Sequence, residues 1–95
     1  MLKPLNPIIH SELRLAVMST LVETEQADFV MLRELTGATA GNLSVQIDKL
    51  AKAGYVSVEK SFKGKRPCTT CRITQEGLEA FSEYVDALKS YVNVK

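Results

Sequence analysis

The sequence contains no long hydrophobic run, and this excludes one broad class of protein. Among its 95 residues, no apolar stretch approaches the roughly 18 residues that a membrane-spanning helix requires. Residues 1–9 are too short and too rich in proline to resemble a secretory signal. We therefore expect a cytoplasmic protein, and the chain length predicts a single domain over residues 1–95.

Residues suited to catalysis or metal binding are also scarce. There is one histidine, His10, and no acid or nucleophile can be identified as its partner, so we expect it to pack locally. Cys68 and Cys71 form a Cys-x-x-Cys pair, but a zinc site needs more ligands, and strand residues three apart point to opposite faces. No glycine-rich phosphate motif is present. We expect no metal, no cofactor and no enzymatic activity, with thiol or metal sensing as the alternative for the cysteines.

The net charge is only +1, but the charge is unevenly distributed. Residues 44–72 contain seven cations and two anions, whereas the flanking segments each have a net charge of −2. A concentrated basic segment suits a polyanion such as nucleic acid. A solvated basic surface remains the alternative, because charge alone does not separate the two.

Hydrophobic spacing predicts the order helix, helix, helix, hairpin, helix. The helices are expected over about 12–23, 29–36, 40–53 and 75–92, and the hairpin over about 55–73. Residues 23–26 are expected to form a connection, with a short extended piece at Phe29 and Val30 as an alternative. Good N-capping residues precede the helices at Ser11, Asp28, Thr39 and Thr74. The predicted fold class is mainly α with a small β-hairpin.

A short turn at residues 37–39 joins the second and third predicted helices. A glycine-containing turn of this length is typical of a DNA-reading helix–turn–helix. The third helix has Leu43, Ile47 and Leu50 on one face, and small or polar residues elsewhere in its first turns. Short side chains let a helix enter the major groove, where Asn and Gln can pair with adenine and Val can touch a thymine methyl. An ordinary surface helix would show the same polar face, so this pattern alone leaves both interpretations open.

The predicted hairpin turn concentrates positive charge. Residues 60–67 include four cations around Gly64, which permits a tight bend. Such self-repulsion would be relieved by a DNA backbone or a narrow minor groove. The alternative is a solvated loop whose lysines prevent edge-to-edge aggregation.

Taken together, these segments resemble the compact winged helix–turn–helix transcriptional regulators of the MarR and ArsR type. The resemblance covers about residues 10–90 and rests on five stretches, 10–18, 28–36, 41–50, 53–56 and 66–77. The combination of Gly-Asn-Leu-Ser with Leu-x-x-Ala-Gly-Tyr-Val is the most specific part. The cysteines depart from the pattern that we expect in such relatives.

The resemblance implies a homodimer that binds double-stranded operator DNA. It implies that the third helix reads bases, that the hairpin is the wing, and that the last helix provides much of the dimer contact. Base reading falls on Asn42, Ser44, Val45 and Gln46, and backbone contact on Lys49, Lys63, Lys65 and Arg66. Thr39, at the start of the helix, completes the candidate DNA-binding set.

The last helix also predicts a dimer on physical grounds. Its apolar residues recur every three or four positions, and such a helix is longer than the rest of this small fold can cover. The uncovered part would stay exposed unless a second copy packed on it. The candidate dimerisation residues are Leu78, Phe81, Tyr84, Val85, Leu88, Tyr91 and Val92.

Two further possibilities concern partners. A winged helix can also serve as a protein–protein interaction module without binding DNA, and the fold alone does not decide. A groove between subunits could hold a small-molecule effector, although no set of residues in the sequence demands one.

Overall fold

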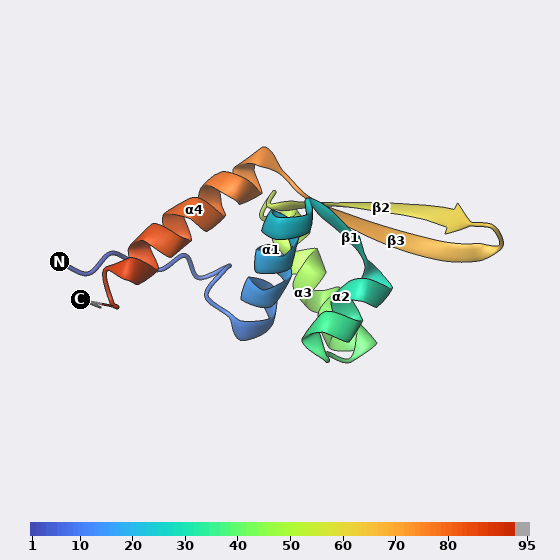
Figure 1. Ribbon diagram of the computed structural model, residues 1–95, viewed down its shortest axis with the longest axis horizontal. Helices are drawn as coiled ribbons and strands as arrows, with labels where there is room; N and C mark the ends of the chain where they lie inside the picture. Colours follow the sequence, from blue (N-terminus) through green and yellow to red (C-terminus); the bar gives the residue numbers. More distant parts are fainter. Residues whose placement is uncertain (93–95) are drawn as a thin grey trace.

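The computed structural model describes residues 1–92 and has extents of 53 × 25 × 21 Å, with two projections from a helical body (Figure 1). The strands β2 (Val56–Lys63) and β3 (Arg66–Ile73) extend from one end of the body, and α4 (Gln75–Lys89) extends from the other with the N-terminal segment beside it. The elements in chain order are α1 (Glu12–Thr24), β1 (Gln26–Asp28), α2 (Phe29–Thr36), α3 (Ala40–Lys52), β2 (Val56–Lys63), β3 (Arg66–Ile73) and α4 (Gln75–Lys89).

Local capping explains where the helices begin and end. The side chains of Ser11, Asp28, Thr39 and Thr74 each accept a backbone N–H from the first turn of their helix, as the sequence predicts. The predicted limits of α1, α2 and α3 are confirmed to within one residue. The last helix, however, ends at Lys89 rather than near residue 92. The N–H groups of Ser90 and Tyr91 bond three residues back, which tightens and closes the final turn.

The sheet contains one strand that the sequence did not predict. The three strands are antiparallel in the order β1-β3-β2, and β1 pairs Ala27 with Cys71. The predicted connection at residues 23–26 is therefore wrong, since α1 continues to Thr24 and β1 begins at Gln26. The alternative of an extended piece at Phe29 and Val30 is also wrong, since α2 begins at Phe29. A strand of three residues shows no alternation of its own and forms only because β3 offers a partner.

The core lies where α1, α2 and α3 meet the base of the sheet. The three apolar residues predicted on one face of α3, Leu43, Ile47 and Leu50, are all buried. On α2 the predicted face is only partly correct, since Leu32 is buried but Leu35 is 62% exposed. The other core residues include Ile9, Val17, Met18, Leu21, Val56, Cys71 and Tyr84.

The start of α4 is fixed by close contact with the backbone of Gly54 and Tyr55, which connect α3 to β2. Thr74 donates its N–H to the Tyr55 carbonyl at 3.0 Å and its hydroxyl to the Gly54 carbonyl at 2.6 Å. Gly77 lies so close that an added Cβ would stand 2.2 Å from the Tyr55 oxygen. This contact sets the direction in which α4 leaves the body. In residues 1–92, none of the helices is long and apolar enough to span a membrane.

Candidate nucleic-acid interface

The turn between α2 and α3 presents the outer face of α3 to solvent. Gly37, Ala38 and Thr39 join the two helices, and the Thr39 hydroxyl accepts the Asn42 N–H at 3.2 Å. Four of the five other candidate residues on α3 are exposed: Asn42, Ser44, Val45 and Lys49. The first turns of the exposed face carry short side chains, with Lys49 further along, the arrangement that the sequence predicts for a helix entering a groove. The one anion on this face, Asp48, pairs with Lys52 at 3.0 Å.

Gln46, the remaining candidate on α3, is partly buried and faces α1. Its side-chain oxygen accepts a hydrogen bond from Nη1 of Arg14, and its Nε2 donates to Oδ1 of Asn42 at 3.0 Å. Sequence reasoning gave Arg14 no role, because it stands on α1 outside the helix–turn–helix. Its position beside α3 follows from helix packing, for which the sequence carries no local signal.

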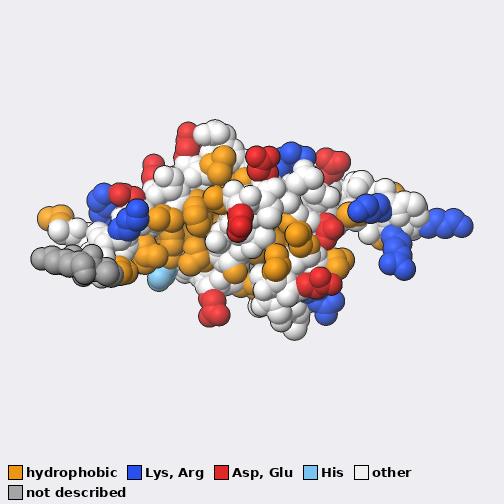
Figure 2. Space-filling view, viewed as in Figure 1, with side chains coloured by type: hydrophobic (Ala, Val, Ile, Leu, Met, Phe, Trp, Pro, Cys, Tyr) orange, Lys and Arg blue, Asp and Glu red, His pale blue; other side chains and the backbone are white. Residues whose placement is uncertain are grey.

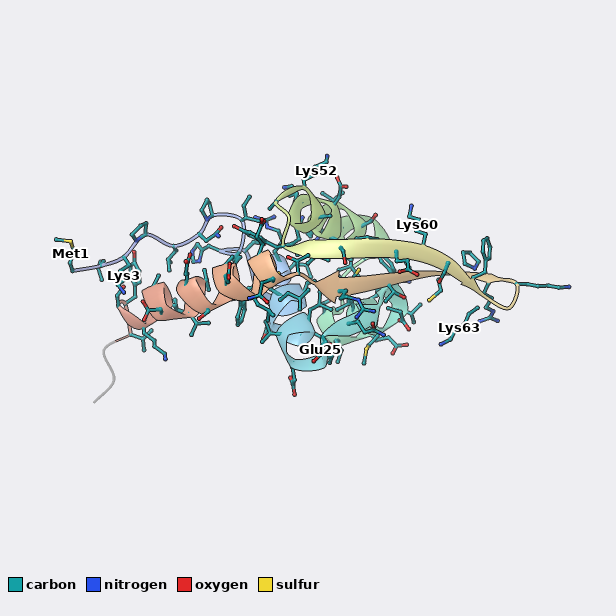
Figure 3. The ribbon with its side chains drawn as sticks, turned by 90° about the horizontal axis from the view of Figure 1, so that it is seen from above. Met1, Lys3, Glu25, Lys52, Lys60 and Lys63 are labelled. Atoms are coloured by element: carbon teal, nitrogen blue, oxygen red, sulfur yellow. The ribbon has the colours of Figure 1, made fainter. Side chains whose placement is uncertain are left out.

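The wing, residues 56–73, is a long hairpin with a basic tip. Gly64 has a φ of +65° whereas Lys65 has no positive φ, a combination typical of the two-residue type II′ turn that suits twisted strands. The turn places Lys63 opposite Arg66, and the cations Lys60, Lys63, Lys65 and Arg66 are all exposed. Figure 2 shows basic side chains at the outer end of the wing, and Figure 3 places Lys60 further back, about halfway along it.

The positive charge of the wing tip is not neutralised within residues 1–92. The two ion pairs in this part of the chain join Lys3 to Asp86 and Lys52 to Asp48, and neither involves the wing. Asp28 lines the grooves that Lys63 also lines, but no ion pair forms between them. The tip therefore retains its charge for an external anion.

The wing leaves the body directly beside α3. Only residues 53–55 separate α3 from β2, so the base of the wing packs against the end of the helix. In Figure 3, Lys52 at the end of α3 and Lys60 on β2 project toward the same side of the molecule, whereas Lys63 projects toward the other. A rod-shaped polyanion lying along that side would meet the end of α3 and part of the wing together.

The two cysteines are separated by the pleat of β3. Cys68 is partly exposed, Cys71 is buried in the core, and both are free. Burial, and to a lesser extent the negative charge of Asp28, raises the pKa of Cys71 to about 11. Among residues 1–92, no group of three or more His, Cys, Asp or Glu side chains is placed to hold a metal ion. The pair therefore lacks the geometry of a shared chelate.

The apolar residues of α4 divide between the inside and the outside of the chain. Phe81 and Leu88 are partly buried against the core cluster, and Tyr84 is only 3% exposed. By contrast, Leu78 is 39% exposed, and Val85 is partly exposed without belonging to the core cluster. Beyond the end of the helix, Tyr91 and Val92 are exposed as well. Tyr84 thus belongs to the chain's own interior, a burial that spacing along the helix did not reveal.

The buried side of α4 is covered by the N-terminal segment. Nδ1 of His10 lies 2.9 Å from the Tyr84 hydroxyl, which accounts for the local packing expected of His10. Tyr91 donates its hydroxyl to the Lys3 carbonyl at 2.7 Å, and Lys3 Nζ lies 2.6 Å from Asp86. Residues 3–10 therefore run along α4 and leave its opposite side open.

A helix–turn–helix followed by a basic two-stranded wing defines the class: a winged-helix domain of the kind that binds DNA. The family model described as "Winged helix DNA-binding domain" matches residues 13–92, so the chain belongs to this family. The chain is also 33% identical over 78 residues to the uncharacterized protein MJ0432 of Methanocaldococcus jannaschii, covering 82% of this chain and 85% of that protein.

Solved structures of transcriptional regulators share the fold of this chain. The transcriptional regulator homologue from Pyrococcus horikoshii OT3 superposes with a TM-score of 0.84 at 29% identity, covering 90% of this chain and 85% of that one. A MarR-family regulator from Enterococcus faecalis V583 shares the fold with a TM-score of 0.70 at 22% identity, covering 88% and 74% of the two chains. The resemblance to winged-helix proteins that bind DNA and the predicted fold class are confirmed.

Proposed function

We propose that this chain acts as a homodimeric, sequence-specific DNA-binding transcriptional regulator, with α3 in the major groove and the wing on the backbone or the adjacent minor groove. The observation that carries the proposal is the pairing of an exposed small-residue face on α3 with a wing whose four exposed cations have no ion-pair partner in residues 1–92. The role proposed is binding rather than catalysis.

The contacts divide into two kinds by their chemistry. Asn42, Ser44 and Val45 stand near the start of α3, where a recognition helix meets base edges. The second kind of contact joins cations to DNA phosphates, and it positions the protein without reading the base sequence. These cations are Lys49, Lys65 and Arg66. Lys63, also predicted from the sequence, projects toward the side opposite Lys52 and Lys60 (Figure 3) and is left out of the set.

The dimer is proposed from the open side of α4. This helix of 15 residues is about 22 Å long. It projects from the body on the side away from the wing (Figure 1). A second copy packed on Leu78 and Val85 would cover the apolar side that residues 3–10 leave open. Two-fold symmetry would then supply a second recognition helix, suited to half-sites about 34 Å apart, and two weak half-sites would combine by effective concentration.

The proposal is tested by titrating a fluorescent mixed-sequence duplex with the protein at several salt concentrations. Binding by cations at phosphates gives a log–log slope of about −0.9 per phosphate contact. Lys65→Ala should reduce affinity and flatten this slope, whereas Arg33→Ala, which removes an exposed cation from α2, serves as the matched control.

The alternative is a winged-helix protein–protein interaction module. It would show no duplex binding, or binding that does not respond to salt. Either result would contradict the proposed function.

A further inference from the structure

Arg14 ties three separate parts of the chain together. Its Nε donates to the Ile8 carbonyl at 2.5 Å and its Nη2 to the Pro7 carbonyl at 3.4 Å. The remaining arm, Nη1, donates to the side-chain oxygen of Gln46 on α3. Because two backbone carbonyls of the N-terminal segment hold the guanidinium, it approaches α3 as a fixed group rather than as a mobile surface cation.

The chemistry of the guanidinium determines which way the Gln46 amide faces. A guanidinium has five N–H donors and no acceptor, so only the oxygen of the amide can face it. The amide nitrogen of Gln46 must then face away from Arg14, and it donates to Oδ1 of Asn42 at 3.0 Å. The orientation of both amides thus follows from donor and acceptor chemistry.

We propose that Arg14 is a specificity-determining positioning residue that makes Asn42 present N–H donors to the DNA. The bond from Gln46 uses one of the two acceptor sites of the Asn42 oxygen and holds that oxygen toward Gln46 along α3, whereas Nδ2 keeps both of its donors for the groove. In the major groove guanine offers two neighbouring acceptors, O6 and N7, whereas bidentate reading of adenine needs the oxygen to accept from N6. Asn42 therefore selects guanine before adenine, although the residue type alone favours adenine. This inference rests on the proposed function.

The test begins with sequences selected by the wild-type protein from a randomised duplex library. Each guanine of the selected site is then replaced by adenine or by 7-deazaguanine, which lacks the N7 acceptor. We expect one guanine position at which wild type discriminates by about tenfold or more, the scale of a good base contact. Asn42→Ala and Arg14→Met should both reduce the ratio of affinities for the guanine duplex and the substituted duplex toward one. Arg33→Met removes an equal charge from an exposed position on α2 and should preserve it.

A second variant reverses the polarity of the same chain of hydrogen bonds. In Gln46→Glu the carboxylate accepts from Arg14 but cannot donate to Asn42. Asn42 then turns its nitrogen toward residue 46 and exposes its oxygen, so the preference should shift from guanine to a base that offers a donor. Each ratio compares the affinities of the same variant for two duplexes. The added negative charge weakens both affinities alike, so its effect cancels in the ratio.

The outcomes separate this inference from the proposed function. If the wild-type protein binds no duplex at all, the proposed function fails. If it binds, but the position that depends on Asn42 is an adenine, the inference alone is overturned. The inference alone is also overturned if Arg14→Met and Gln46→Glu both fold and both keep the wild-type preference for guanine. Should Arg14→Met not fold in a thermal melt, the reversal expected of Gln46→Glu decides the matter.

Discussion

Nδ1 of His10 lies 2.9 Å from the hydroxyl of Tyr84, and the two rings stand 6.1 Å apart at 37°. This pair joins the N-terminal segment to the middle of α4, where Tyr84 is buried. The same segment holds the guanidinium of Arg14 through the carbonyls of Pro7 and Ile8. The segment therefore contacts both the proposed dimerisation helix and, through Arg14, the proposed recognition helix.

The His10–Tyr84 contact should contribute to stability. Removing the hydroxyl in Tyr84→Phe leaves His10 without this partner, and we expect a decrease of about 0.5–1.5 kcal/mol in the free energy of unfolding. Urea denaturation of Tyr84→Phe, His10→Ala and the double variant measures the coupling between them. Strictly additive effects would show that the two side chains do not interact.

The wing cations should act on all DNA sequences alike. Arg66→Ala removes a tip charge that has no ion-pair partner in residues 1–92, and the paired change at Lys65 removes a second. We expect weaker binding to specific and random duplexes by similar factors, and a salt slope that is smaller by about 0.9 for each phosphate that the variant no longer neutralises. Weakening confined to the preferred site would indicate base reading by the wing instead.

The open side of α4 should govern the oligomeric state. Val85→Lys places a charge on the proposed contact and should yield a monomer in sedimentation at micromolar concentration. Leu88→Lys is a poorer choice, because Leu88 packs against the chain's own core. Glu79→Lys, an exposed position on another side of α4, should remain dimeric. A wild-type monomer at that concentration would contradict the proposed dimer.

Gly77 should not tolerate a side chain. In Gly77→Ala the new Cβ would meet the Tyr55 carbonyl oxygen at 2.2 Å, so α4 must shift. We expect a decrease of about 1–3 kcal/mol in stability, the scale of overpacking in a close contact. Gly41→Ala is the matched control, since its Cβ meets nothing within 4 Å and helix propensity predicts a gain of about 0.5–1 kcal/mol. Equal effects at the two positions in thermal melts would refute the close contact as the cause.

The buried thiol of Cys71 should make stability sensitive to alkaline pH. Burial, with the Asp28 charge, raises its pKa from the ordinary 9.0 to about 11. The folded state holds the Cys71 proton more tightly than the unfolded state does, so the contribution of the thiol to the free energy of unfolding is fully present below pH 9.0. It is lost as pH rises toward about 11. The difference in unfolding free energy between wild type and Cys71→Ala should therefore narrow over that range.

Thiol labelling offers an independent check on Cys71. At pH 8 a thiol reagent should modify the partly exposed Cys68 in the folded protein, and Cys71 only after unfolding. Rapid labelling of Cys71 in the native state would contradict its burial.

Features that depend on neighbouring residues could be predicted from the sequence. The caps at Ser11, Asp28, Thr39 and Thr74 and the apolar spacing on α3 place three helices to within one residue. The Lys-Gly-Lys turn locates the hairpin and gathers its cations at the tip. These are local features, because a cap or a two-residue turn is decided by contacts within a few positions along the chain.

What required the tertiary structure is every contact between distant segments. β1 exists only as a partner for β3, and Arg14 reaches Gln46 only because α1 packs against α3. Likewise, spacing along α4 shows an apolar stripe but not which part the N-terminal segment covers. Tyr84 is buried against His10, which lies more than 70 positions away in the chain. Leu78 is exposed because the close contact at Gly77 fixes the direction of α4. The sequence alone determined which elements form and where the charge lies. The packing of those elements decided which side chains remain free to bind, because exposure depends on all the segments that meet at a site.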